Sequence, residues 1–350
     1  MPYTDFSDKA FWKRCREDNQ FLVSEIYQPK FQLLPGARIA TAGSCFAQNI
    51  AKYVRASELE WVNVEPAPKA MPIDVASRFG YGLFSARYGN IYTVRQLLQL
   101  LQDMVGETLH KEAIWERNGR YFDAIRPNVE PQGFESSREL CAHRLDHLRR
   151  VRRIFDEAEV FVFTLGLTET WQDRETGIVF PTVPGLFAGN FDAKQHEFVN
   201  FGFDDTYEDL ASAIHLMHKL NPQLKILLTV SPVPLTATAS GYHVLQATTY
   251  SKSVLRTVAG EIVGMDDRID YFPSYELITG TPFSGKFFGE NLRTVTQKGV
   301  QNVMAVFFGA HIGLSSIPSP EPEETLHQGS SELDDELVCE EALLESFTKA

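Results

Sequence analysis

The chain has 350 residues, of which 43% are hydrophobic and 23% are charged, with 23 Gly and 18 Pro. This composition excludes a collagen-like, coiled-coil or wholly disordered protein and leaves room for one large or two small globular domains. The formal net charge is −13, and residues 316–350 carry −9 of it, because they hold ten acids and one base. The nearly neutral remainder has no long Lys/Arg run, which argues against nucleic acid and anionic membranes as partners.

The start of the chain and its cysteines bear on the compartment. No apolar run approaches the length of a membrane span, and the first twenty residues are charged throughout, unlike a signal peptide. We therefore expect a cytoplasmic protein. The four cysteines lie far apart without Cys-x-x-Cys spacing, which predicts free thiols rather than a zinc site or disulfides: Cys15, Cys45, Cys141 and Cys339.

From about Arg38, short β-branched or aromatic runs alternate with long amphipathic stretches, the α/β pattern of a parallel sheet covered by helices. The predicted strands are Ala37–Ala42, Trp61–Glu65, Val160–Leu165, Lys225–Val230 and Ile269–Phe272. The predicted helices are Phe46–Arg55, Thr93–Gln102, Ser136–Phe155, Thr206–Leu220, Ala247–Val263 and Thr296–Phe308. Turn residues in the middle of Trp171–Pro184 predict a hairpin beyond the third strand.

We divide the chain into an N-terminal extension (1–33), one domain (34–313) and an acidic tail (314–350). The tail opens with a Pro- and Glu-rich stretch that predicts an extended linker. Beyond it, the residues Ser331–Phe347 have two interpretations. They form either a solvated disordered tail or a short amphipathic helix that docks a protein partner, because four apolar side chains share one helical face.

The residues after the first predicted strand suit a reaction centre. Residues 41–47 read TAGSCFA, in which Gly43 permits a tight turn and Ser44 lies where the next helix begins. Backbone N–H groups at a helix start favour negative charge, so Ser44 is a candidate nucleophile or part of an anion site. The alternative is an ordinary turn with Ser44 as helix N-cap. Neither the Gly-x-Gly-x-x-Gly fingerprint nor a P-loop is present, so a nucleotide cofactor has no support.

Small and polar residues also follow the other predicted strands. Residues 164–171 read TLGLTETW after the third strand, SPVP and a loop with His243 follow the fourth, and PSYE follows the fifth. Ligands of a doubly wound sheet bind beyond the carboxyl ends of its strands. We therefore expect the site at this edge of the sheet.

Residues 43–47, GSCFA, spell the motif after which the GSCFA family is named, and further stretches resemble that family in order along the chain. These are residues 88–93 (YGNIYT), 163–171 (FTLGLTETW), 229–235 (TVSPVPL), 251–253 (SKS) and 271–276 (YFPSYE). The resemblance spans roughly Leu34 to Ala310. It implies a relationship to the SGNH-type hydrolases, which have a three-layer α/β/α sandwich fold with a central parallel sheet and cleave or transfer ester-linked acyl groups, often on glycans.

The resemblance also implies residue roles. Ser44 matches the acyl-accepting serine, and its own backbone N–H would be one oxyanion donor. Gly89 and Asn90 fall where the second motif supplies a donor, and Gly166 to Glu169 stand where the third supplies Gly-x-Asn-Asp. Thr168 holds the Asn position of that motif. Asn90 is the expected substitute, because oxyanion stabilisation needs a preorganised donor near the developing charge.

The general base of such an enzyme is missing from its usual place. SGNH enzymes carry Asp-x-x-His before the last helix, whereas this chain has Asn291 and Thr294 at those two positions. A serine without a base within hydrogen-bond reach is a poor nucleophile at neutral pH. Either another group acts as base or the activity is lost.

Several residues are candidates to replace the missing base or to bind substrate. His243 is the first, because its loop leaves the fourth strand and can fold over the crevice. Glu169 and Glu276 are bases if burial raises the pKa of the carboxyl group, and otherwise they accept hydrogen bonds. Arg293 would bind an anionic group of the substrate or form a surface ion pair.

Three other features have ordinary explanations. His143 and His147 are four residues apart on one face of a predicted helix, and His215 and His218 are three apart on another helix. Neither pair has an obvious third metal ligand. Cys45 is a rival thiol nucleophile, although a small buried cysteine behind the turn is the commoner role.

The sequence predicts a cytoplasmic ester hydrolase or O-acyltransferase that acts on a carbohydrate or other small polar ester through Ser44. We assign it no metal and no organic cofactor. The alternative is a catalytically inactive glycan- or partner-binding module that keeps the crevice without the base.

Overall fold

The computed structural model of the chain describes residues 2–15, 23–313, 318, 344 and 347. The predicted linker and the segment Ser331–Phe347 therefore lie almost entirely outside the described residues, as does Cys339. Cys15, Cys45 and Cys141 are free thiols, as predicted.

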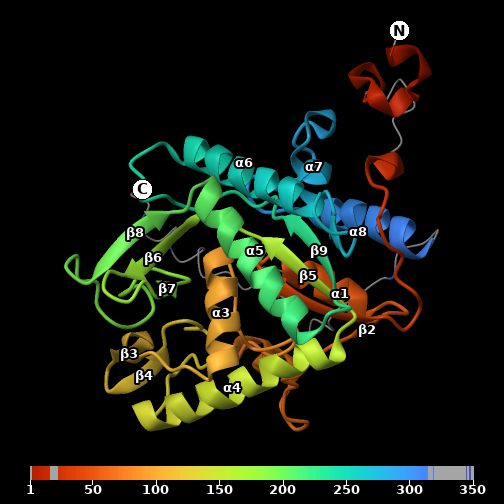
Figure 1. Cartoon of the computed structure of the whole chain (residues 1–350). Coiled ribbons are helices and arrows are strands. Elements are labelled where there is room, and N and C mark those ends of the chain that lie inside the picture. Colours follow the sequence, from red (N-terminus) through yellow and green to blue (C-terminus); the bar gives the residue numbers. More distant parts are fainter. Residues whose placement is uncertain (1, 16–22, 314–317, 319–343, 345–346, 348–350) are drawn as a thin grey trace, which may run out of the picture.

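The centre of the molecule is a sheet of five parallel strands (Figure 1). Its strands are β1 (Arg38–Gly43), β2 (Glu60–Trp61), β5 (Val160–Leu165), β9 (Lys225–Val230) and β10 (Ile269–Tyr271), in the order β10-β9-β5-β1-β2. Strands β5 and β9 are almost entirely buried apolar runs, as expected of strands covered on both faces. Four of the five predicted strands are confirmed with small shifts at their ends, whereas the predicted strand Trp61–Glu65 overlaps β2 only at Trp61.

Helices cover both faces of this sheet and make the fold a three-layer α/β/α sandwich, as predicted. One face packs against α3 (Val94–Gly106), α4 (Ser137–Glu157), α5 (Phe203–Leu220) and α6 (Val244–Val263). The other packs against α1 (Ala47–Arg55), α7 (Ser274–Thr279) and α8 (Gln297–Ile312). The six predicted helices are confirmed within a few residues at each end. The short helices α2 (Ile73–Arg78) and α7 were not predicted.

Two small antiparallel sheets flank the sandwich. The predicted hairpin is present as β6 (Glu169–Asp173) and β7 (Val179–Phe180), and β8 (His196–Asn200) pairs with β6 as a third strand. A second hairpin, β3 (Ile114–Arg117) with β4 (Arg120–Asp123), was missed. Its turn is Asn118-Gly119, both at positive φ, the residue pair most typical of a two-residue hairpin turn.

The second strand is shorter than the predicted Trp61–Glu65. Only Glu60 and Trp61 pair with β1. Beyond them the chain turns inward: the N–H of Val64 donates to the carbonyl of Ser85 at 2.9 Å, and Asn63 Oδ1 accepts the N–H of Glu65 at 3.2 Å. The last bond to β1 is from the N–H of Val62 to the carbonyl of Ile39 at 2.9 Å, and the strand ends early because Val64 bonds to Ser85 instead.

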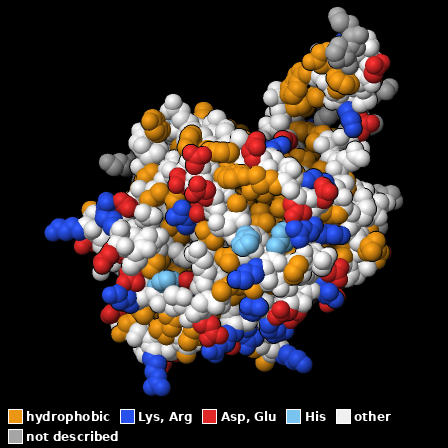
Figure 2. All heavy atoms as spheres, viewed as in Figure 1, with side chains coloured by type: hydrophobic (Ala, Val, Ile, Leu, Met, Phe, Trp, Pro, Cys, Tyr) orange, Lys and Arg blue, Asp and Glu red, His pale blue; other side chains and the backbone are white. Residues whose placement is uncertain are grey.

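The N-terminal segment projects from the sandwich as short 3₁₀ turns (Figure 1). Apolar side chains gather on it in the space-filling view, and Tyr3, Phe6 and Trp12 are more than half exposed (Figure 2). Further along, Tyr27 is buried, and its hydroxyl donates to Asp270 Oδ2 at 2.8 Å, so the end of the predicted extension packs onto the domain. Among the helices that the structure describes, none is long and apolar enough to cross a membrane.

Candidate functional site

The strand order places a topological switch point between β1 and β5. The chain leaves β1 to form β2 on one side, then crosses to β5 on the other side and continues outward through β9 and β10. The connections after β1 and β5 therefore diverge at their carboxyl ends, which is where doubly wound sheets bind ligands. Ser44 follows β1, and Gly166 follows β5.

Gly43 fixes how the chain leaves β1. Its φ is +134°, and a Cβ atom on it would collide with the backbone of Thr164 on β5. The N–H of the next residue, Ser44, donates to the carbonyl of Thr164 at 3.1 Å. Because this N–H already donates to Thr164, it is not free to stabilise an oxyanion as predicted in this arrangement.

The Ser44 hydroxyl is buried and unpaired. The residue is 3% exposed, and its Oγ has no hydrogen-bond partner among the described residues. It does not cap α1, so the alternative interpretation of Ser44 as an N-cap is wrong: the N-cap position is Phe46 and has no side-chain cap. Buried polar atoms without partners are rare in folded proteins and are often explained by a catalytic role or a missing ligand.

Gly166 brings the end of β5 against Ser44. A Cβ atom on Gly166 would lie 2.9 Å from Ser44 Cβ and 2.8 Å from the carbonyl oxygen of Tyr92. Both the Gly166 and Leu167 N–H groups donate to that same carbonyl, at 3.1 and 2.9 Å. Only glycine allows the three segments to approach this closely, which is a physical reason for the glycine in this motif.

Helix α6 contributes two consecutive side chains to the same place. Ser251 Oγ accepts the N–H of Thr168 at 3.0 Å, and Lys252 Nζ donates to the carbonyl of Gly166 at 2.6 Å. Both side chains are fully enclosed, Lys252 being 2% exposed. Sequence reasoning noted residues 251–253 only as a family-like stretch and gave Lys252 no role.

The segment with Gly89 and Asn90 also lies at this edge. Gly89 has a φ of +68°, and the N–H of Ile91 donates to the carbonyl of Gly43 at 2.9 Å. Asn90 is buried, and its Oδ1 accepts from Gln48 Nε2 at 3.3 Å. The structure therefore brings this segment to the turn before Ser44, as the resemblance implies.

The side chains of Thr168 and Glu169, which follow β5, both form hydrogen bonds to other parts of the fold. Thr168 Oγ1 donates to Asn200 Oδ1 at 2.6 Å, which ties the motif to β8. Glu169 accepts from the Thr238 hydroxyl at 2.7 Å. Burial raises the pKa of the Glu169 carboxyl group above its usual value, and hydrogen bonds from Thr238 and the Ala239 backbone act against that rise. The loop between β9 and α6 therefore holds the Glu169 carboxyl group.

His243 lies apart from the buried serine. It is exposed, it is the N-cap of α6, and its Nδ1 accepts the N–H of Leu245 at 3.2 Å. No hydrogen bond between His243 and Ser44 occurs in the described chain. Its predicted role as base stays a prediction.

Asn291 and Thr294, which stand at the Asp-x-x-His positions, form a hydrogen bond with each other. Asn291 Nδ2 donates to Thr294 Oγ1 at 2.9 Å, and Asn291 Oδ1 accepts the N–H groups of Arg293 and Thr294 at 3.0 and 2.9 Å. Both Asn291 and Thr294 are exposed. Glu276 lies elsewhere, in an ion pair with Arg256 at 2.6 Å and a hydrogen bond from Tyr271 at 2.8 Å. None of these carboxyl or amide groups contacts Ser44 through an interaction that the described residues show.

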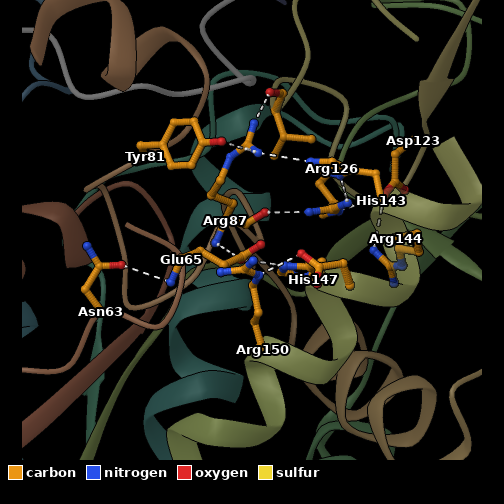
Figure 3. Close-up of polar contacts among 12 residues, drawn as sticks. Asn63, Glu65, Tyr81, Arg87, Asp123, Arg126, His143, Arg144, His147 and Arg150 are labelled. Atoms are coloured by element: carbon orange, nitrogen blue, oxygen red, sulfur yellow. Dashed lines mark hydrogen bonds and ion pairs between the residues drawn. The ribbon is translucent and has the colours of Figure 1, made fainter. Parts of the chain in front are cut away.

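A buried charged cluster forms around Glu65, Arg126 and His147 (Figure 3). His147 Nδ1 is 2.7 Å from Glu65 Oε2, and Asp123 pairs with Arg126 at 2.7 Å and with Arg144 at 3.5 Å. Sequence reasoning missed this cluster. His143 and His147, considered above as a metal pair, belong to it, and no group of metal-binding side chains occurs among the described residues.

Charges in the cluster set its protonation. Burial, then the charge of Arg126, lowers the pKa of His147 to about 4, so the ring is neutral at pH 7. Burial raises the pKa of Glu65, but His147 and Arg126 more than offset this and bring it to about 2. The Nδ1–H of a neutral His147 therefore donates to the Glu65 carboxylate. The remaining ring nitrogen, Nε2, is then a buried acceptor without a partner among the described residues.

The cluster reaches the site through Arg87. The N–H of Arg87 donates to Glu65 Oε2 at 2.6 Å, and the carbonyl of Arg87 accepts from Arg126 at 3.1 Å. The next residue, Tyr88, donates its hydroxyl to the carbonyl of Thr41 in β1. The charged cluster thus fixes the segment that ends in Asn90 against β1, the strand that precedes Ser44.

A sequence profile of the GSCFA family matches residues 38–307. The chain belongs to the GSCFA family. The matched region runs from β1 to α8 and includes every segment described at the switch point. Among curated proteins, no relative matches this GSCFA protein.

Proposed function

We propose that this GSCFA protein is an SGNH-like ester hydrolase or O-acyltransferase that acts on a carbohydrate or other small polar ester, with Ser44 as the nucleophile. The observation that carries the proposal is the buried Ser44 hydroxyl without a partner at the switch point of the sheet. A hydroxyl that serves only the fold would be expected to bond to a neighbour. The reaction class rests on the family resemblance.

The surrounding groups support acyl transfer. Ser44 Oγ would attack the acyl carbon, and the Asn90 segment would stabilise the oxyanion that forms, as the resemblance implies. Such donors act best when they are preorganised. Preorganisation is supported here by the hydrogen bond from Gln48 to Asn90 and by the charged cluster behind Arg87.

The second candidate is a binding module without catalytic activity. It is favoured by the exposed turn in which Asn291 and Thr294 bond to each other where SGNH enzymes keep their Asp and His. It predicts saturable binding of a ligand and no turnover. A slow esterase rate that disappears in Ser44→Ala would reject it.

The test is covalent labelling by a fluorophosphonate probe, followed by mass spectrometry of the intact protein. We expect one adduct in the unmodified protein and none in Ser44→Ala, with Cys45→Ala as the matched control that keeps the adduct. His243→Ala is measured in parallel, because loss of labelling there would implicate His243 as the base. A folded protein without any adduct would reject the enzyme and favour the binding module.

A further inference from the structure

The proposed reaction needs a group that removes the proton from Ser44. In the described structure, His243 is exposed, and Asn291 and Thr294 bond to each other. Glu169 and Glu276 are held by Thr238 and Arg256. By contrast, the side chain of Lys252 reaches Gly166, the residue that packs against Ser44.

Lys252 and Ser44 both lie against Gly166. Lys252 Nζ lies 2.6 Å from the Gly166 carbonyl oxygen, and a Cβ atom on Gly166 would lie 2.9 Å from Ser44 Cβ. The two side chains are 2% and 3% exposed, so both are shielded from bulk water. A catalytic hydrogen bond is often absent or long in a free enzyme and forms only when the substrate is bound.

We propose that Lys252 is the proton acceptor for Ser44 and that the two form a Ser–Lys dyad in place of the missing Asp-x-x-His. The inference rests on the proposed function. Serine–lysine pairs perform this chemistry on other folds. To accept a proton, the amine must be neutral before attack, and removal of an ammonium group from water disfavours its charged form.

The step balances with no co-reactant other than water or an acceptor hydroxyl. As the Ser44 Oγ–acyl carbon bond forms, the Oγ proton moves to Lys252 Nζ. The bond between the acyl carbon and the alkoxy oxygen then breaks, and Nζ returns the proton to the leaving oxygen. In the second half, water or a sugar hydroxyl attacks the acyl-enzyme, gives its proton to Nζ and displaces Ser44, which recovers a proton.

Lys252 also holds the Gly166 carbonyl, so the experiment must separate proton transfer from this structural contact. Lys252→Gln keeps an N–H donor at a similar position but has no amine, whereas Lys252→Met removes both. Lys219→Met, on the exposed side of α5, is the matched control. The rate of Ser44 labelling by the fluorophosphonate probe and the thermal midpoint are measured for each variant.

A base role predicts that both Lys252 variants label at least about a hundredfold more slowly, the usual contribution of general base catalysis. A purely structural role predicts that Lys252→Gln labels at the normal rate and that only Lys252→Met loses stability. Normal labelling in a folded Lys252→Gln overturns the proposal. Absence of labelling in the unmodified protein would instead overturn the proposed function.

A structure of the unmodified protein labelled at Ser44 provides the second measurement, which needs no folded variant. We expect Lys252 Nζ within about 2.6–3.2 Å of Ser44 Oγ or of an oxygen on the bound probe. If Lys252 Nζ stays at the Gly166 carbonyl and approaches neither oxygen, or if His243 occupies that position, the proposal is wrong.

Discussion

The charged cluster at Glu65 and His147 and the serine site at Ser44 are both buried, but they differ in how many of their polar groups have hydrogen-bond partners. In the cluster, Asp123 has two arginine partners, and Glu65 accepts bonds from a histidine and a backbone N–H. In the serine site, the Ser44 hydroxyl has no partner in the described chain. The nearby Lys252 donates instead to the carbonyl of Gly166.

This difference separates groups that hold the fold from groups that remain available. A buried charge without a partner is costly, so the cluster must be almost fully paired to exist at all. An unpaired hydroxyl costs less, about 1–3 kcal/mol, and a catalytic or ligand-binding role would explain the one at Ser44. The cluster should therefore govern stability and the serine site should govern labelling.

The largest effect should come from breaking the charged cluster. Asp123→Asn leaves Arg126 and Arg144 buried without their shared carboxylate, and we expect a loss of about 3–5 kcal/mol in the free energy of unfolding. Glu107→Gln is the control, because it breaks an exposed pair with Arg149 and should cost less than about 1 kcal/mol. Urea unfolding measures both. Equal small losses would mean that the cluster does not stabilise the fold.

Acid should weaken the fold through its buried histidines, of which His143 and His147 belong to the charged cluster and His311 contacts Tyr27 instead. Burial lowers the pKa of His143, His147 and His311 to about 4, so between pH 6.5 and 4 the unfolded chain binds more protons than the folded one. Stability should therefore fall as pH falls through that range. Below it, Glu65 and Asp123, with a pKa of about 2, extend the loss.

The measurement is the urea midpoint from pH 7.5 to 5. His147→Gln should reduce the slope against pH, since one histidine no longer titrates differently in the two states. His215→Gln, at an exposed position of α5, should leave the slope unchanged. An identical slope in both variants would contradict the assignment of this pH dependence to the cluster.

A smaller effect is expected from crowding the serine site. Gly166→Ala would place a methyl group against Ser44 Cβ and the Tyr92 carbonyl, which should cost about 1–3 kcal/mol and displace Ser44. We expect fluorophosphonate labelling to slow at least tenfold. Gly260→Ala, on the exposed side of α6, is the control and should gain up to about 1 kcal/mol from helix propensity. Unchanged labelling in Gly166→Ala would mean that Gly166 does not position the serine.

The parts of the fold that sequence predicted best have local signals. The strands β5 and β9 are continuous apolar runs with turn residues at both ends, and their predicted bounds match the structure. The position of Ser44 after β1 followed from the same reading. The β3–β4 hairpin also has a local signal, the Asn118-Gly119 turn, although its two strands are only four residues long and were not predicted.

Other features have no local signal. In the charged cluster, Glu65 follows β2, Asp123 ends β4 and His147 belongs to α4. Glu65 and His147 are 82 positions apart, so no spacing rule connects them. The proximity of Lys252 to Gly166 likewise depends on how α6 packs across the sheet. In the sequence, only the family resemblance of residues 251–253 (SKS) points to this position, and it implies no role for Lys252.

The smallest effect separates two roles of His243. As N-cap of α6, its Nδ1 accepts one backbone N–H, so His243→Ala should cost about 0.5–1 kcal/mol, whereas His243→Asn should keep most of that cap. Neither variant retains an imidazole. If His243 is the base, both should lose Ser44 labelling regardless of the cap. If it is only a cap, both should label at the normal rate, and only His243→Ala should unfold at lower urea, which would leave Lys252 as the group that activates the serine.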